Sequence, residues 1–273
     1  MLQLHSRFED GTTRKIPFEA FTFPGGEQGV CIDTAALHEA AAGSFTIEAA
    51  LRNSGDVLTL LMLTDALRQA LPTAEISLVM PYVPYARQDR VCRPGESLSI
   101  RVFAQLINTQ NFRTVTILDP HSSVTPALIN NVVVTDARDH VARAVAAMGG
   151  DVVLVAPDMG AAGRVREIAA ALGLPMLQAQ KTRHASSGVV TGVEILGDIP
   201  NKPLLVVDDI CDGGRTFIEL ALAVHRVAPM QTMGLYVSHG IFSKGLGVLS
   251  PLYSQVFTAN SWLDSSTPGL SLV

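Results

Sequence analysis

One segment constrains the fold of this chain more than any other, the stretch from Leu204 to Glu219 (LLVVDDICDGGRTFIE). It opens with an uninterrupted apolar run, Leu204–Val207, which is typical of a strand buried on both faces in a parallel sheet. Aspartates and glycines follow, and a helical pattern begins at Thr216. A strand, a polar turn and a helix in this order predict an α/β sheet, whose ligands bind beyond the carboxyl ends of the strands.

The residues of this turn suit a sugar phosphate. Gly213 and Gly214 allow the backbone to turn tightly, so the N–H groups at the start of the following helix can hold a phosphate. Asp208 and Asp209 would then reach ribose hydroxyls or a magnesium ion. The alternative is that the acidic pair only caps a helix or lies in a solvated loop, which would require the whole string to coincide by accident.

Apolar strands and helical patterns alternate along most of the chain. The expected strands are Ile76–Met80, Thr114–Leu118, Val132–Thr135, Val152–Ala156, Glu194–Leu196, Leu204–Val207, Thr232–Ser238 and Gln255–Thr258. The expected helices are Asp56–Leu71, Leu98–Thr109, His140–Met148, Gly163–Leu172 and Thr216–Val227. This alternation predicts parallel α/β architecture. Because the pattern begins again near residue 140, we expect two similar α/β domains, residues 1–139 and 140–273.

Composition limits the cellular location and the kinds of binding partner that we expect. A formal net charge of -5 argues against general nucleic-acid binding, and no apolar run approaches the roughly 20 residues that span a bilayer. The N-terminal residues lack the apolar core of a secretory signal. The three cysteines contain no CxxC pair, so neither a zinc site nor a disulfide framework is indicated. We therefore expect a cytoplasmic protein with no membrane or nucleic-acid partner.

A second polar cluster lies in PYVPYARQDRVCR, after the expected strand that ends near Met80. Arg87, Gln88, Asp89 and Arg90 are adjacent there, and clustered guanidinium groups suit a triphosphate. A solvated surface loop is the alternative explanation, although the flanking prolines favour a shaped segment.

Three further segments contain candidates that are weaker on their own. His121 follows a strand and Asp119, so it can ligate a metal or contact a phosphate, although an ordinary turn explains it better. Asp158 precedes a loop of small residues that can cradle an anion or simply join a strand to a helix. Lys181 and Arg183 lie in a polar segment, where they are either exposed charges or part of a loop that closes over a phosphate.

Taken in order, these segments resemble the ribose-phosphate diphosphokinases, also called phosphoribosyl pyrophosphate synthetases. The resemblance runs from about Phe23 to Asn260 and rests on PYVPYARQDR, LDPH, APDMG and VVDDICDGGRT. The phosphate loop is shared with many phosphoribosyltransferases, whereas YARQDR together with LDPH is specific. The resemblance implies two phosphoribosyltransferase-like domains, each a mainly parallel sheet flanked by helices. It also implies Mg²⁺-dependent transfer of the β,γ-diphosphoryl group of ATP to the anomeric hydroxyl of ribose 5-phosphate, giving phosphoribosyl pyrophosphate and AMP.

The resemblance also implies roles for individual residues. Those implied to bind ATP are Phe23, Glu27, Arg87, Gln88, Asp89, Arg90 and His121. Those implied to surround the ribose and its 5-phosphate are Asp208, Asp209, Asp212, Gly213, Gly214, Arg215 and Thr216. His121 and Asp158 would hold magnesium, and Lys181 and Arg183 would stabilise the transition state as the catalytic pair. Phe23 and Glu27, in FPGGE, resemble a segment that contacts adenine in a neighbouring subunit, which implies a homo-oligomer with a shared active site.

The chain departs from the family pattern at the phosphate loop. Gly213 stands where a threonine is usual, and Arg215 where a small residue is usual. A more open pocket with an added guanidinium suggests an alternative acceptor that is larger, such as ADP-ribose. Gly25 replaces a usual aspartate, which weakens the expected adenine contact. The chain also ends soon after FTANSW, so the usual hexamer and its nucleotide regulation are not expected to carry over unchanged.

Two further interpretations remain open. A phosphoribosyltransferase that consumes the activated sugar would share the phosphate loop, but YARQDR argues against it. A non-catalytic regulatory homologue would bind nucleotide or a catalytic partner, but the retained Lys181, Arg183, His121 and aspartates argue against it. Release of AMP from ATP would distinguish a diphosphokinase from the transferase.

Overall fold

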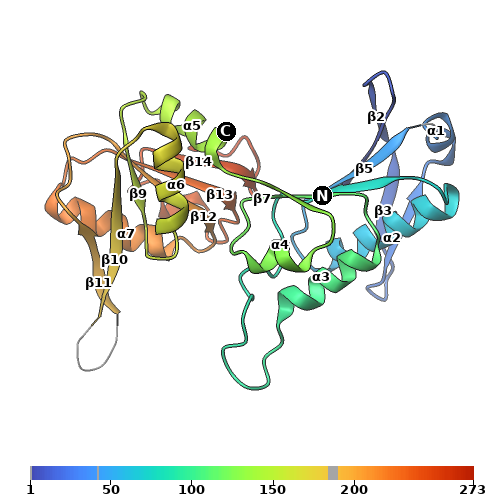
Figure 1. Ribbon diagram of the computed structural model, residues 1–273, viewed down its shortest axis with the longest axis horizontal. Coiled ribbons are helices and arrows are strands. Elements are labelled where there is room, and N and C mark those ends of the chain that lie inside the picture. The colour runs from blue at the N-terminus through green and yellow to red at the C-terminus, as the bar shows by residue number, and fades with distance from the viewer. Residues whose placement is uncertain (1, 42, 184–189) are drawn as a thin grey trace. The chain divides into compact units, whose positions relative to one another are not determined.

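The computed structural model describes residues 2–41, 43–183 and 190–273, and within these ranges it describes all side chains except those of residues 181–183 and 190–192. The chain divides into two compact units, Met1–Thr135 and Asp136–Val273 (Figure 1). The division lies between the last strand of the first unit and the first helix of the second, a little before the expected boundary after residue 139. Each unit has a hydrophobic core of its own.

The first unit is built on a mainly parallel sheet. Its elements, in chain order, are β1 (Leu2–Arg7), β2 (Thr13–Ile16), β3 (Phe18–Thr22), β4 (Gln28–Ile32), α1 (Thr34–Glu39), β5 (Ser44–Ala49), α2 (Ser54–Ala70), β6 (Ile76–Val79), α3 (Ser99–Thr109), β7 (Val115–Leu118), α4 (Val124–Leu128) and β8 (Val132–Thr135). The strand order is β2-β1-β5-β6-β7-β8, in which β5 to β8 run parallel and β1 pairs antiparallel with β2 and β5. The hairpin of β3 and β4 forms a separate two-stranded sheet.

Alternating side chains determine which face of the first sheet belongs to the core. Phe45 and Ile47 in β5, and Ile76 and Leu78 in β6, are buried, whereas the residues between them are at least partly exposed. Because successive strand residues point to opposite faces, one face carries the buried side chains. Buried apolar residues of α2 and α3 pack into the same core.

Helix α2 follows from local signals in the sequence. Asn53 precedes it and accepts a hydrogen bond from the N–H of the third helical residue, and Pro72 follows its end. Leu60, Leu63 and Leu67 recur at helical spacing and are fully buried. The helix has 17 residues, and no helix in the described part of the chain combines the length and apolar composition of a membrane span.

The second unit contains a larger, mainly parallel sheet. Its elements, in chain order, are α5 (Arg138–Ala147), β9 (Val153–Ala156), α6 (Ala162–Leu172), β10 (Met176–Arg183), β11 (Val190–Leu196), β12 (Leu204–Cys211), α7 (Arg215–Val227), β13 (Met233–Gly240), the short 3₁₀ helix η1 (Leu246–Val248), β14 (Gln255–Ser261) and β15 (Leu270–Leu272). The strand order is β11-β10-β9-β12-β13-β14-β15, and the pair β10–β11 is antiparallel while the other pairs are parallel.

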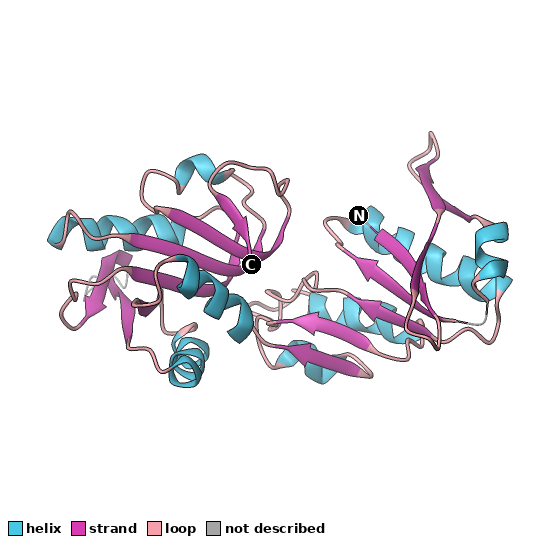
Figure 2. Ribbon diagram, turned by 90° about the horizontal axis from the view of Figure 1, so that it is seen from above, coloured by secondary structure: helices cyan, strands magenta, loops and turns pink. Residues whose placement is uncertain are grey.

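Helices cover both faces of this second sheet. In β12, Leu204 and Val206 belong to a cluster that includes α7, while Leu205 and Val207 belong to a cluster that includes α5 and α6. All four side chains are fully buried, which confirms the prediction for this run. In Figure 2 the strands of the second unit lie between helices on both sides. Because β12 pairs with β9 and β13, it lies in the interior of the sheet.

The α/β prediction is confirmed, and the structure corrects it in three places. Every predicted helix and strand is present, with ends that differ by a few residues. Strand β12 continues to Cys211, so Asp208 and Asp209 lie inside the strand rather than after it. Strand β10 continues to Arg183, so the expected polar loop is in part a strand. Strands β5 and β15 and helices α1 and α4 were not predicted, since each has at most six residues and is too short for a clear periodic pattern.

Candidate active site

The acidic pair lies near the carboxyl end of β12, between β9 on one side and β13 on the other. The side chains of Asp208 and Asp209 are 16% and 7% exposed, respectively. Asp208 Oδ1 accepts a hydrogen bond from the backbone N–H of Asp209 at 2.9 Å. Both carboxylates therefore lie at the sheet edge where α/β folds bind their ligands.

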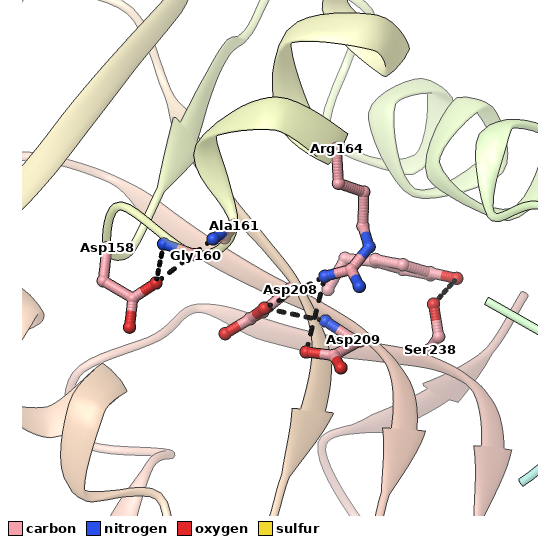
Figure 3. A network of polar contacts seen from close by, with 8 residues as sticks. Asp158, Gly160, Ala161, Arg164, Asp208, Asp209 and Ser238 are labelled. Carbon is pink, nitrogen blue, oxygen red and sulfur yellow. Dashed lines mark hydrogen bonds and ion pairs between the residues drawn. The ribbon is translucent and has the colours of Figure 1, made fainter. Parts of the chain in front are cut away.

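An arginine that the sequence analysis did not single out holds this pair (Figure 3). Arg164 Nη1 lies 3.5 Å from Asp208 Oδ1 and 3.4 Å from Asp209 Oδ1. Arg164 is in the first turn of α6, the helix that follows β9. Because β9 and β12 are neighbours in the sheet, the start of α6 lies beside the end of β12. The order of the strands, which the sequence does not reveal, is what brings Arg164 to the pair.

Burial makes ionisation of this pair costly. It raises the pKa of Asp208 well above the ordinary value, and the neighbouring charge of Asp209 raises that pKa further. The backbone N–H of Asp209 and the guanidinium of Arg164 oppose the rise. Strongly shifted carboxyl groups cluster at functional sites, and this pair is suited to accepting hydroxyl protons in hydrogen bonds or to binding a cation.

The glycine loop after β12 ends at an uncapped helix. Gly214 has φ +77° and precedes Arg215, the first residue of α7. Within the described part of the chain, no side-chain cap accepts a hydrogen bond from the first N–H groups of this helix. The first N–H groups of a helix lack acceptors within the helix and form the positive end of its dipole. The tight turn expected at Gly214 is confirmed, and the helix start has the geometry that binds phosphates. Gly213 does not adopt the left-handed conformation.

The other residues of this loop differ in exposure. Thr216 is half-buried in the first turn of α7, and the carbonyl of Asp212 accepts a hydrogen bond from the N–H of Ser243 at 3.2 Å. Arg215 is 88% exposed, and its Nε donates to Glu219 Oε1 at 2.7 Å. The guanidinium that the sequence placed at the phosphate loop is therefore already paired along the helix.

Asp158 follows β9 and closes a turn. Its Oδ1 accepts hydrogen bonds from the N–H groups of Gly160 at 2.9 Å and Ala161 at 3.2 Å, as Figure 3 shows. These N–H groups are thus directed at the protein's own carboxylate. The N–H groups of Gly160 and Ala161 therefore stabilise a strand-to-helix turn, which is the second of the two alternatives for this loop, and do not form a cradle for a bound anion.

Four of the candidate ATP residues lie in the loop after β6. Arg87, Gln88 and Arg90 are exposed, and Asp89 is half-buried. The N–H of Ile100, at the start of α3, donates to the carbonyl of Gln88, so the loop is tied to the helix behind it. These side chains are presented at the carboxyl edge of the first sheet.

His121 lies at the same edge of the first unit. It is exposed and follows β7, which is the neighbour of β6 in the sheet. Asp119, two residues earlier, is 8% exposed, and its backbone has φ +37°. Because parallel strands end at the same edge, the structure places His121 on the edge that carries Arg87 to Arg90.

Phe23 and Glu27 close the turn between β3 and β4. The N–H of Phe23 donates to the carbonyl of Glu27 at 2.8 Å, and the N–H of Gly26 donates to the carbonyl of Phe23 at 2.8 Å. Phe23 is 49% exposed, and its ring meets that of Phe21 edge-to-face with centroids 5.0 Å apart. The hairpin tip therefore presents apolar surface.

Lys181 and Arg183 lie in the last residues of β10, opposite Val193 and Val190 of β11. Their side chains, and the whole of His184, are outside the described residues. Their backbone positions place them in the same sheet as the acidic pair, two strands away from β12.

A buried acidic pair followed by a glycine loop that opens a helix defines the second unit as a phosphoribosyltransferase-type domain, and residues 132–257 match the family described as the phosphoribosyl transferase domain. Residues 16–110 match the N-terminal domain of ribose phosphate pyrophosphokinase. The chain belongs to the ribose-phosphate pyrophosphokinase family.

Individual relatives agree with this assignment. The ribose-phosphate pyrophosphokinase of Methanosarcina acetivorans is 35% identical over 208 residues, covering 76% of this chain and 70% of that protein. That of Mycoplasma pneumoniae is 35% identical over 192 residues, covering 68% of this chain but 57% of that protein, which is less than two thirds of its length. The phosphoribosylpyrophosphate synthetase structure from Mycobacterium smegmatis has the same fold, with a TM-score of 0.74, 21% identity, and coverage of 94% of this chain and 86% of that one.

Proposed function

We propose that this protein transfers the β,γ-diphosphoryl group of ATP to the anomeric hydroxyl of ribose 5-phosphate, releasing AMP. The observation that carries the proposal is the buried pair Asp208–Asp209 followed by the uncapped start of α7. One end of this arrangement accepts hydrogen bonds from hydroxyl groups, and the other binds a phosphate. The names of the relatives support this function over a phosphoribosyltransferase or a regulatory homologue.

In this proposal the second unit binds the acceptor. Asp208 and Asp209 accept hydrogen bonds from the ribose hydroxyls, and the 5-phosphate is bound by the backbone of the loop that follows. The residues of that loop are Asp212, Gly213, Gly214, Arg215 and Thr216. An oriented sugar hydroxyl is a competent nucleophile, so catalysis depends on alignment and charge neutralisation rather than on a covalent intermediate.

The residues proposed for ATP are Arg87, Gln88, Asp89, Arg90 and His121, on the carboxyl edge of the first sheet. Exposed guanidinium groups can bind the phosphates bidentately. Arg93 in the same segment is engaged with Glu96, to which its Nε donates at 2.9 Å. Arg87 and Arg90, whose side chains are exposed, are the other two guanidinium groups of this segment, and we propose that they contact the phosphates of ATP.

We assign transition-state stabilisation to Lys181 and Arg183. Two cations at the end of β10 can neutralise charge that develops on the transferred group. Lys181→Ala combined with Arg183→Ala should lower kcat by at least about 100-fold with a smaller change in KM. Lys202→Ala is the matched control, because its ammonium pairs with Asp151 at 2.8 Å in the same unit. Unchanged turnover in the double variant would refute the assignment.

The residues present fit a magnesium ion that is bound largely through substrate oxygens. Within the described ranges, no three or more His, Cys, Asp or Glu side chains converge on a point. Mg²⁺ needs few protein ligands, since it keeps several waters and binds substrate phosphates. Asp158, with a carboxylate oriented by its turn, and His121 are the proposed protein contacts. Bound Mg²⁺ would neutralise charge on the ATP phosphates.

We also propose a homo-oligomer in which Phe23 and Glu27 of one subunit contact adenine bound to another. The exposed aromatic tip of the β3–β4 hairpin supports this. Phe23→Ala should raise the KM for ATP without changing the KM for ribose 5-phosphate. Light scattering of the purified protein would show whether it is oligomeric. A cytoplasmic location is proposed as well, since Cys31 and Cys92 are exposed thiols and Cys211 is also unpaired.

The decisive experiment for the function is an acceptor panel with Mg-ATP, in which AMP release is measured. Ribose 5-phosphate should support AMP release, and ribose without a phosphate should not. ADP-ribose tests the larger acceptor: AMP release with ADP-ribose alone would overturn the proposed substrate. Product formation from phosphoribosyl pyrophosphate and a base, without ATP, would instead indicate a phosphoribosyltransferase. Asp209→Asn should abolish activity with the true acceptor.

A further inference from the structure

Lys244 lies beside the phosphate loop, although no sequence motif singled it out. A β-carbon at Gly213 would lie 3.6 Å from Lys244 Cε and 3.8 Å from Lys244 Cδ. The ammonium nitrogen is one C–N single bond, about 1.5 Å, beyond Cε. The alkyl stem of Lys244 therefore lies beside the first glycine of the loop, and its ammonium group is one bond further along the side chain.

The turn that carries Lys244 is fastened to this loop by backbone hydrogen bonds. The carbonyl of Cys211 accepts from the N–H of Phe242 at 3.0 Å, and the carbonyl of Asp212 accepts from the N–H of Ser243 at 3.2 Å. Phe242 is 2% exposed, so its ring anchors the turn in the core. Lys244 thus extends from a fixed backbone, and binding an anion would order its side chain alone.

Lys244 is also a cation of this region that has no partner among the residues whose placement the structure describes. Arg215 is paired with Glu219, and Arg164 faces the acidic pair. Among the residues that the structure describes, no hydrogen bond or ion pair involves Lys244, whose side chain is exposed. A phosphate at the start of α7 would experience repulsion from the acidic pair and from Asp212, and a nearby ammonium group would offset it.

We propose that Lys244 is an acceptor-binding residue whose ammonium group pairs with the 5-phosphate of the sugar phosphate. This inference rests on the proposed function, because it assigns the anion at the start of α7 to the acceptor. A lysine supplies a point charge with three rotatable donors, which complements the fixed N–H groups of the helix start. The absence of a side chain at Gly213 leaves the stem of Lys244 its place beside the loop.

The test compares Lys244→Met, which keeps an unbranched stem without the charge, with Lys244→Arg, which keeps the charge. Lys244→Met should raise the KM for ribose 5-phosphate about 10- to 100-fold, with little change in the KM for ATP or in Tm. Lys244→Arg should stay within about 3-fold of the wild type. The Kd of ribose 5-phosphate, measured by calorimetry without ATP, should follow the KM. Lys202→Met is the control for loss of a lysine in the same unit.

Gly213→Thr provides a second variant, since its added atoms would displace the stem of Lys244. It should raise the KM in the wild-type background and raise it less when combined with Lys244→Met. Unchanged ribose 5-phosphate affinity in Lys244→Met, together with normal wild-type activity, would overturn the inference and leave the proposed function standing. A wild-type protein that neither binds ribose 5-phosphate nor releases AMP would overturn the proposed function itself. If Lys244→Met fails to fold, Lys244→Gln gives the same comparison.

Discussion

Arg164 and Asp209 form a largely buried ion pair. Arg164 Nη1 lies 3.4 Å from Asp209 Oδ1, and the two side chains are 20% and 7% exposed. The same nitrogen is 3.5 Å from Asp208 Oδ1, so one guanidinium faces two carboxylates. The cluster has an excess of negative charge when both carboxyl groups are ionised, which favours ligands that donate hydrogen bonds or carry positive charge.

Removing Arg164 should damage both activity and stability. Arg164→Met removes the guanidinium that faces the two carboxylates. The free energy of unfolding should fall by about 1–3 kcal/mol, and kcat/KM for ribose 5-phosphate should fall at least about 10-fold. Arg164→Lys should retain part of both. Arg166→Met is the control, because Arg166 is exposed on the same helix. Steady-state kinetics and thermal melts would measure these effects, and wild-type activity in Arg164→Met would contradict the role.

Asp208→Asn should stabilise the fold while reducing activity. Burial, followed by the charge of Asp209, raises the pKa of Asp208 in the folded state, so its ionised form destabilises that state. The penalty is absent below the ordinary pKa of 3.8 and grows as the pH rises toward the folded pKa. Near pH 8, Asp208→Asn should therefore raise the free energy of unfolding by about 1 kcal/mol, which corresponds to a few degrees in Tm. Both increases should be smaller near pH 5.

Circular-dichroism melts of Asp208→Asn at both pH values would test this sign. The exposed Asp198 offers a control, since Asp198→Asn should leave Tm within about 1 °C of the wild type. A stabilisation by Asp208→Asn that is larger near pH 5 than near pH 8 would refute the explanation.

The two glycines of the phosphate loop should respond differently to alanine. Gly214 has φ +77°, and a β-carbon there would lie 3.3 Å from Leu249 Cδ2. Gly214→Ala should cost about 1–2 kcal/mol of stability and lower Tm by several degrees. A β-carbon at Gly213 would make ordinary contacts, so Gly213→Ala should change stability by less than about 0.5 kcal/mol. Similar Tm values for the two variants would contradict the assignment of the tight turn to Gly214.

Cys211, the last residue of β12, should be unreactive although it directly precedes the phosphate loop. It is 1% exposed, and burial raises the pKa of its thiol to about 12, with smaller contributions from Asp212 and Asp208. The thiolate, which is the nucleophile, is therefore scarce at neutral pH. Iodoacetamide should modify the exposed Cys31 and Cys92 in the native protein, and Cys211 only after unfolding. Peptide mass spectrometry would identify the sites, and rapid labelling of Cys211 in the native protein would contradict its protection by burial.

The pattern of apolar residues along the sequence was sufficient to predict the α/β architecture. The run Leu204–Val207 is apolar at every position because both faces of β12 are covered, and that burial is visible in the sequence itself. Turn chemistry was equally local, since a left-handed residue before a helix favours glycine and Gly214 supplies it. The acidic pair and the phosphate loop are contiguous in the chain, so their composition already indicated an anion and hydroxyl site.

The tertiary structure decided which distant side chains complete that site. Arg164 lies 44 residues before Asp208, and Lys244 follows a different strand from the loop it approaches. Both reach β12 because β9 and β13 are its neighbours, so the segments that follow those strands start at the same sheet edge. Strand order arises from long-range packing of apolar faces and leaves no local pattern in the sequence. The local sequence therefore determined that this is a site for hydroxyl groups and a phosphate. The order of the strands determined that the charged side chains of Arg164 and Lys244 lie beside it.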